Sequence, residues 1–156
     1  MRTLLALLAV AGFLGLSGCS SQPEVREIEV HIGYTADRQH QYMEPKEIRV
    51  SEGERFRLVI TNDDKVGASD SFHDVAFRYA AYGLIEHEVP PGKTVETCIP
   101  QAEPDRACPE GKDFIEATEK GSFKVWCEVG PMGTNPDGSP KTRHEQMGMW
   151  ATLIVE

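Results

Sequence analysis

The sequence is short of basic side chains, with 16 lysines and arginines against 25 aspartates and glutamates and a formal net charge of −9. Proteins that bind nucleic acid through its phosphates need a basic face, so we expect no nucleic-acid partner. Long apolar runs are also missing, because the run over 4–16 has thirteen residues and a helix of that length cannot cross a bilayer. No repeat or linker divides the 156 residues, which predicts a single domain.

The N-terminal residues have the pattern of an export signal. Arg2 supplies a positive start, the apolar run follows, and Leu16-Ser17-Gly18-Cys19 resembles the lipobox of bacterial lipoproteins. The resemblance implies a signal peptide over 1–18, a lipid on Cys19, a tether over 19–24 and a folded domain over 25–156. The lipid would hold the protein on a membrane of the bacterial cell envelope, facing the periplasm, without a spanning helix. An ordinary signal peptide cut near Gly18, with Cys19 as a free thiol, is the alternative.

Cysteine is scarce, with four in the chain, and each needs a role in an oxidising compartment. Cys98 and Cys108 lie ten residues apart in a proline-rich polar segment and can close a short loop as a disulfide, worth ~2–3 kcal/mol in the chain-entropy model. With Cys19 lipidated, Cys127 has no partner, and metal ligation is the role that we predict for it. A disulfide between Cys127 and either Cys98 or Cys108 is the competing arrangement.

Alternation of apolar and polar residues predicts an all-β domain. The expected strands, which are separated by polar turn signals, are 26–32, 47–50, 55–61, 73–77, 94–98, 121–128 and 150–155. The segment 110–120 is compatible with one or two helical turns. Short strands with frequent turns are typical of a β-sandwich or barrel.

Strand alternation also sorts the histidines, because successive side chains on a strand point to opposite faces. His73 shares a face with two apolar residues of its strand, and Cys127 does the same on a later strand, so both are predicted to point inward. His31, His40 and His87 have charged or amide neighbours and are predicted to face water. A single inward histidine is commonly a core residue, but an inward unpaired cysteine beside it favours a shared set of metal ligands.

The last thirty residues contain Cys127, His144 and Met149, in that order. A thiolate, an imidazole and a thioether suit copper, and two histidines and one cysteine with a weak axial methionine form the blue-copper arrangement. His73 supplies the second imidazole.

The order of these residues resembles the cupredoxins, the family of plastocyanin and azurin. The resemblance covers 28–155 and rests on Thr61-Asn62 at a strand end, His73-Asp74, a Pro-Pro-Gly-Lys turn, the strand ending in Cys127, and His144-Glu-Gln-Met-Gly-Met149 before a closing strand. It implies a Greek-key β-sandwich that holds one copper ion. The implied equatorial ligands are His73, Cys127 and His144, and the implied axial ligand is Met149.

Met147 is the competitor of Met149 for the axial position. The spacing from His144 to Met149 is plastocyanin-like, whereas Met147 has the spacing of the copper domain of cytochrome oxidase subunit II. That two-copper type needs a second cysteine four residues after the first, and this chain has Pro131 there. One copper ion is therefore expected.

Two features depart from the family pattern. Sixteen residues separate Cys127 from His144, where family members use far fewer, which affects how the second imidazole approaches the metal. Asp74 follows His73 where plastocyanin and azurin have an asparagine that steadies the cysteine loop. Asp74 is either a replacement for that asparagine or an outward surface acid.

The resemblance implies an electron-transfer protein rather than an enzyme, and no general acid, base or substrate-binding set is evident. A six-residue tether reaches only ~20 Å when extended, so the expected partner is a membrane-bound oxidase, reductase or cytochrome. A copper carrier or store is the alternative, because Met132, Met147 and Met149 offer thioethers to Cu(I). A metal-free interaction module is the third hypothesis, and the intact ligand set argues against it.

Overall fold

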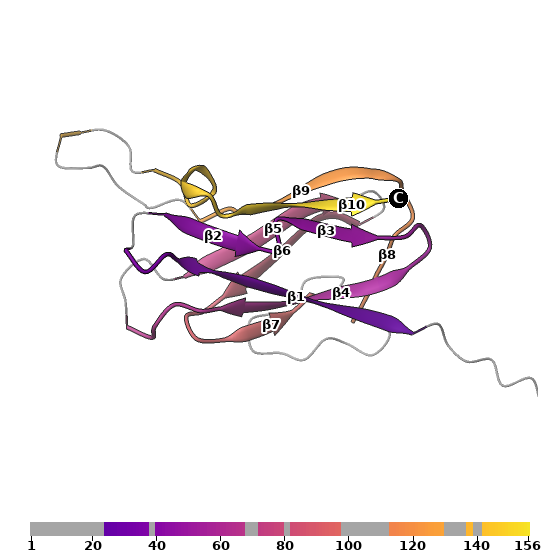
Figure 1. The fold of residues 1–156 in the computed structure, drawn as a ribbon, viewed down its shortest axis with the longest axis horizontal. Helices are drawn as coiled ribbons and strands as arrows, with labels where there is room; N and C mark the ends of the chain where they lie inside the picture. Colours follow the sequence, from indigo (N-terminus) through magenta and orange to yellow (C-terminus); the bar gives the residue numbers. More distant parts are fainter. Residues whose placement is uncertain are drawn as a thin grey trace, which may run out of the picture.

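The computed structural model describes residues 24–37, 40–67, 72–79, 82–97, 113–129, 137–138 and 142–156. Within these ranges the chain forms two β-sheets that face each other as two layers (Figure 1). Cys19, Cys98 and Cys108 lie outside the described residues, so the lipid and the disulfide stay predictions. None of the described segments is an apolar helix of membrane-spanning length.

The first sheet contains β1 (Val25–Tyr34), β2 (Gln41–Glu44), β4 (Arg55–Asn62) and β7 (Thr94–Glu96), in the order β2-β1-β4-β7. The short strand β8 (Ile115–Glu116) also pairs with β4. β1 runs parallel to β4 over the whole length of β4, and the other pairs are antiparallel. The sheet is therefore mixed.

The second sheet has the order β3-β10-β9-β5-β6. Its strands are β3 (Glu47–Val50), β5 (His73–Tyr79), β6 (Gly83–Val89), β9 (Gly121–Cys127) and β10 (Trp150–Val155). The chain passes from the first sheet to the second between β2 and β3, where Pro45 has no N–H to offer a neighbouring strand. The 3-10 turn η2 (Glu145–Met147) lies two residues before β10 (Figure 1).

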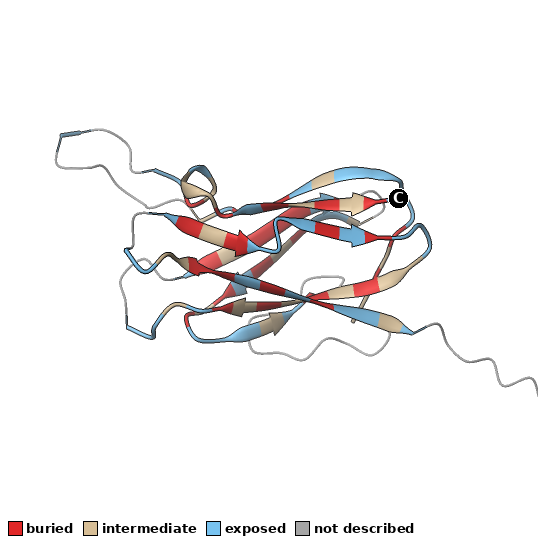
Figure 2. Cartoon of the chain, viewed as in Figure 1, coloured by how far each residue is buried: buried red, intermediate tan, exposed pale blue. Residues whose placement is uncertain are grey.

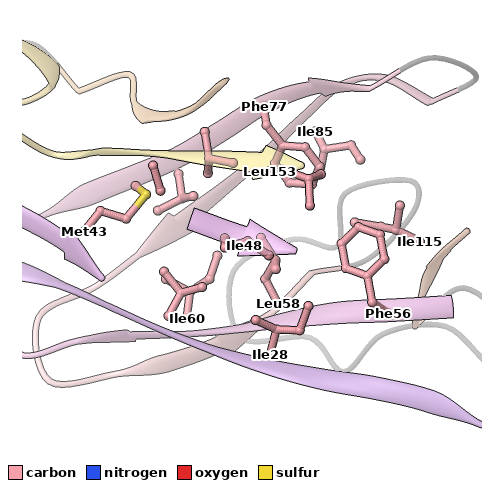
Figure 3. Close-up of a cluster of buried hydrophobic side chains, with 14 of the residues drawn as sticks. Ile28, Met43, Ile48, Phe56, Leu58, Ile60, Phe77, Ile85, Ile115 and Leu153 are labelled. Atoms are coloured by element: carbon pink, nitrogen blue, oxygen red, sulfur yellow. The ribbon is translucent and has the colours of Figure 1, made fainter. Parts of the chain in front are cut away.

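The core lies between the sheets and follows from the alternation of the strands. In β4 every second residue is buried, from Phe56 to Asn62, and the residues between them are half-buried (Figure 2). Ile28 and Leu58 from the first sheet approach Phe77, Ile85 and Leu153 from the second across the interior (Figure 3). This burial supplies the main favourable free energy of folding.

The predicted all-β sandwich is confirmed, but the strand assignment was incomplete. β2 and β6 were not predicted, and the helical turns expected over 110–120 are wrong where the structure describes that segment, because Ile115–Glu116 is a strand. The physical reason for this strand is its position in the fold. Ile115 is fully buried, and it pairs with Phe56 of β4 in an antiparallel ladder. Tertiary pairing decides the conformation of so short a segment.

Candidate metal centre

Antiparallel pairing in the second sheet gathers the predicted ligands at one end. β9 lies between β5 and β10 and runs opposite to both, so the end of β9 meets the starts of its two neighbours. Val75 of β5 is the register partner of Cys127, and the Cys127 N–H donates to the carbonyl oxygen of Met149 at 3.1 Å. His73 and Met149 therefore both stand beside the end of β9.

Three side chains meet at this point. The Nδ1 atoms of His73 and His144 are 3.1 Å apart, and Cys127 Sγ is 3.5 Å from Nδ1 of His144 and 3.9 Å from Nδ1 of His73. A triangle with such sides has its corners about 2 Å from its centre, which is close to the length of metal–nitrogen and metal–sulfur bonds. All three residues are buried, with exposed fractions of 0, 1 and 2% for His73, Cys127 and His144.

The donor set fits copper by its chemistry. Two imidazole nitrogens and one thiolate sulfur are the equatorial donors of blue-copper sites, and the hard cations prefer oxygen. Among the described residues, this is the group of histidine, cysteine or acidic side chains whose donor atoms converge, all within 4.8 Å of one another. The structure thus brings together three of the four predicted metal ligands by their donor atoms.

Comparison with known proteins supports this architecture at the level of fold. No protein-family model and no curated protein matches the sequence. Among solved structures, auracyanin B matches 87% of this chain and 91% of its own at 11% identity, with a TM-score of 0.52. Auracyanin A of Chloroflexus aurantiacus, a "blue" copper protein, matches 83% and 99% at 14% identity, with a TM-score of 0.50. The chain has the cupredoxin fold.

The same fold also occurs within larger copper enzymes. The copper nitrite reductase of Nitrosomonas europaea matches 85% of this chain at 17% identity and a TM-score of 0.51, but only 42% of its own chain takes part. The cupredoxin fold is therefore shared by small copper proteins and by domains of enzymes. Because one fold can host several functions, a function is inferred from the residues of the site and not from the fold.

Burial controls the protonation of the cysteine. It raises the pKa of Cys127 to about 11, and the backbone N–H groups of Asp74 and Val129 oppose this only in part. The Asp74 N–H lies 3.5 Å from Cys127 Sγ. A thiolate at this position is consequently stable at neutral pH only when a cation neutralises it.

Burial acts in the opposite direction on the histidine. It lowers the pKa of His73, and the hydrogen bond and charge of Asp64 counteract it. The Nε2 atom of His73 is 2.9 Å from Asp64 Oδ2, while Nδ1 faces the other two donors. A neutral imidazole is the form that binds metals. Asp64 was not predicted from the sequence, because nothing in the polar stretch around it distinguishes Asp64 from its acidic neighbour Asp63.

Met149 is fully buried and directly precedes β10. Gly148 before it has a φ of 111°, and a Cβ added there would lie 2.7 Å from the carbonyl oxygen of Gln41. Only glycine fits this close approach, so Gly148 sets how the chain enters β10. Met147, the competing axial candidate, lies in η2 and is half-buried.

The remaining histidines were only partly predicted. His31 and His40 are exposed as expected, and His31 pairs with Asp63. The expectation for His87 was wrong, because its exposed fraction is 3%. Its neighbours Glu86 and Glu88 point to the other side of β6, so charged neighbours in sequence indicate an inward residue here. His87 does not belong to the converging group.

Asp74 is not a plain surface acid. It is half-buried, and its carbonyl oxygen accepts from the Glu128 N–H at 2.8 Å. Burial raises the pKa of Asp74 from 3.8 to about 7, and the hydrogen bond and charge of Glu86 and the charges of Glu128 and Glu88 act in the same direction. Its backbone contacts the cysteine, while its side chain belongs to an acidic cluster.

This cluster makes stability depend on pH. Between pH ~4 and ~7 the folded state holds a proton on Asp74 that the unfolded chain loses, so the free energy of unfolding falls as the pH rises through this window. The variant Asp74→Asn has no carboxyl group to titrate at this position, so its free energy of unfolding should not fall for this reason. The difference in the free energy of unfolding between the variant and the native protein should therefore grow in favour of the variant from pH 4 to pH 7. Denaturant unfolding of the metal-free proteins measures the difference.

Glu86→Gln is the matched control for that measurement. It removes the charge of Glu86 and replaces its carboxyl group with an amide that can donate to the Asp74 carboxylate, so the pKa of Asp74 should be raised less and the pH dependence attributed to Asp74 should become shallower in this background. Parallel stability curves for the native protein and Asp74→Asn across this range would contradict the assignment.

Proposed function

We propose that the chain is a mononuclear copper protein that transfers electrons, of the type 1 or blue-copper kind. The observation that carries the proposal is the buried triangle of two imidazole nitrogens and one sulfur on a cupredoxin fold. His73, Cys127 and His144 would hold the metal in the equatorial positions, and Met149 would be the weak axial ligand. A bound copper ion supplies one-electron exchange between Cu(I) and Cu(II).

The chain's own contribution is to keep the donors in place. Cys127 is held on both sides by β5 and β10, and His73 is the first residue of a strand that is paired on both edges. The carbonyl oxygen of His144 accepts hydrogen bonds from the N–H groups of Met147 and Met149 at 3.1 Å. These bonds hold the backbone of His144 and the backbone of Met149 in a fixed relative position. Stiff ligands rearrange little when the charge of the metal changes, which favours fast electron transfer.

We do not assign an enzymatic activity. The three donor side chains are almost completely buried, so they present little surface to a substrate. Electron transfer needs no such access, because an electron can leave through a buried ligand to a docked redox protein. A cytochrome, oxidase or reductase is the partner that this function requires.

The N-terminal pattern adds a location to this proposal. A lipid on Cys19 would tether the domain to a membrane of the bacterial cell envelope, on the periplasmic side. β1 begins at Val25, six residues after Cys19, so the tether would be short. A domain tethered this close to the membrane would meet membrane-bound redox partners most often.

The copper site is tested by its colour. The full protein, purified in mild detergent and loaded with Cu(II), should show an intense absorption band near ~600 nm from charge transfer between the Cys127 thiolate and copper. Cys127→Ser should abolish the band, because an alcohol oxygen does not give this transition. A band that survives the substitution would contradict the ligand assignment, as would its absence from the native protein.

The same sample separates electron transfer from copper transport. Rapid and reversible reduction by a cytochrome, with copper retained in both oxidation states, is the expected result. Loss of copper to a competing chelator within minutes would instead identify a carrier.

The axial ligand is tested with a matched pair of methionine variants. Met149→Leu should raise the reduction potential by roughly 60–100 mV, which corresponds to a ten- to fiftyfold loss of Cu(II) affinity relative to Cu(I), because the weak thioether donor is removed. Met147→Leu should leave the potential and the visible spectrum unchanged. Protein-film voltammetry measures both, and the reverse order of effects would make Met147 the axial ligand.

The anchor is tested by fractionation of cells that express the protein. The native protein should sediment with membranes and partition into detergent. Cys19→Ala should leave it unlipidated, because a lipobox cysteine is the residue that carries the lipid. Membrane association that is indifferent to this substitution would exclude a lipid on Cys19.

A further inference from the structure

Asp64 makes a contact that the copper proposal does not use. Its Oδ2 atom lies 2.9 Å from Nε2 of His73, on the side of the imidazole ring that faces away from the other donors. Both side chains are buried, with exposed fractions of 9% for Asp64 and 0% for His73. A buried carboxylate beside a candidate metal ligand calls for a specific role, because an acidic side chain is costly to remove from water.

The carboxylate is held in place from several directions. The N–H of Tyr34, at the end of β1, donates to Asp64 Oδ1 at 2.9 Å. The Asp64 N–H donates to Oδ1 of Asn62 at 3.0 Å, and Asn62 Nδ2 donates to the carbonyl oxygen of Val89 at 2.8 Å. The orientation of Asp64 is therefore set by the ends of β1, β4 and β6 rather than by the histidine alone.

This geometry determines which nitrogen of His73 carries the proton. A carboxylate oxygen only accepts hydrogen bonds, so a bond at 2.9 Å requires the proton to be on Nε2. Nδ1 then carries a lone pair instead of a proton, and it is the nitrogen that faces His144 and Cys127. The opposite tautomer would point a proton at the position of the metal and leave Asp64 without its donor.

We propose that Asp64 is the positioning residue of the centre, which holds His73 as the Nε2–H tautomer with Nδ1 ready to bind copper, and whose negative charge favours Cu(II) over Cu(I). The inference rests on the copper function proposed above. Carboxylates that accept from a ligating histidine raise its basicity and fix its ring, and their removal weakens metal binding ten- to a hundredfold.

The tautomer can be read without copper, so the first test does not depend on the metal. In the metal-free, full-length protein in detergent micelles, ¹⁵N chemical shifts of the His73 ring should show a protonated Nε2 and an unprotonated Nδ1. A proton on Nδ1, or rapid exchange between the two tautomers, would overturn the proposal.

The second test compares Asp64→Asn with Asp63→Asn. The two substitutions remove the same charge from adjacent positions, but Asp63 bonds to His31 and Tyr42 and does not reach His73. In Asp64→Asn the side-chain amide can donate to Nε2, which favours a proton on Nδ1. For Asp64→Asn we expect the dissociation constant for Cu(II) to be at least tenfold larger than that of the native protein, and the dissociation constant for Cu(I) to increase less. For Asp63→Asn we expect both dissociation constants to be near the native values.

Competition with a chelator of known affinity measures the two dissociation constants, and voltammetry gives their ratio independently. A tenfold larger loss for Cu(II) than for Cu(I) corresponds to a rise of about 59 mV in the reduction potential. Equal affinities and potentials for the two variants would show that Asp64 has only a structural role. If Asp64→Asn does not fold, the ¹⁵N shifts of the native protein still decide the tautomer.

The two proposals fail in different ways. A native protein without a thiolate-to-copper band refutes the copper function, whatever the tautomer of His73. A native protein with the band but with His73 protonated on Nδ1 before metal is added leaves the copper function intact and refutes the role of Asp64.

Discussion

The pairing of the end of β9 with its two neighbours is the constraint on which the rest of the site depends. The N–H of Cys127 bonds to the carbonyl oxygen of Met149 on one side, and the residue stands in register with Val75 of β5 on the other. Because neighbouring strands run in opposite directions, one strand end and two strand starts coincide at this edge. The position of the site is thus set by the hydrogen-bond register of the sheet. A shift of β9 by one residue relative to its neighbours would turn Cys127 to the opposite face of the sheet.

Burial gives this edge of the sheet its chemistry. The Cys127 thiol and the His73 imidazole are both removed from water, and burial drives each toward its neutral form by raising the pKa of Cys127 and lowering the pKa of His73. A cation placed among them reverses this preference for the sulfur and uses the neutral nitrogens as they are. The cost of burying the Cys127 thiolate is therefore offset when a metal cation is bound.

Much of the site could be predicted from sequence because the alternation of side chains along a strand shows which residues point inward. His73 and Cys127 sit at inward positions of strands that were recognisable, and His144 and Met149 followed from their order along the chain. His87 was misjudged when the charges of its neighbours were given more weight than the alternation itself. β2 and β6 were missed because four and seven residues of mixed polarity give a weak periodic signal. Asp64 could not be predicted, since its contact with His73 depends on how three strand ends meet in space.

The tight approach of Gly148 to the carbonyl oxygen of Gln41 has a consequence for how such a chain can change in length. Hydrogen bonds from Met147, Gly148 and Met149 back to His144 and Glu145 close the segment that links the last two candidate ligands, and the contact with β2 leaves no room beside it. An insertion there would have to break this closed turn. The sixteen-residue span that departs from the family pattern lies instead upstream of His144. A change of length in that span would leave the spacing from His144 to Met149 unchanged.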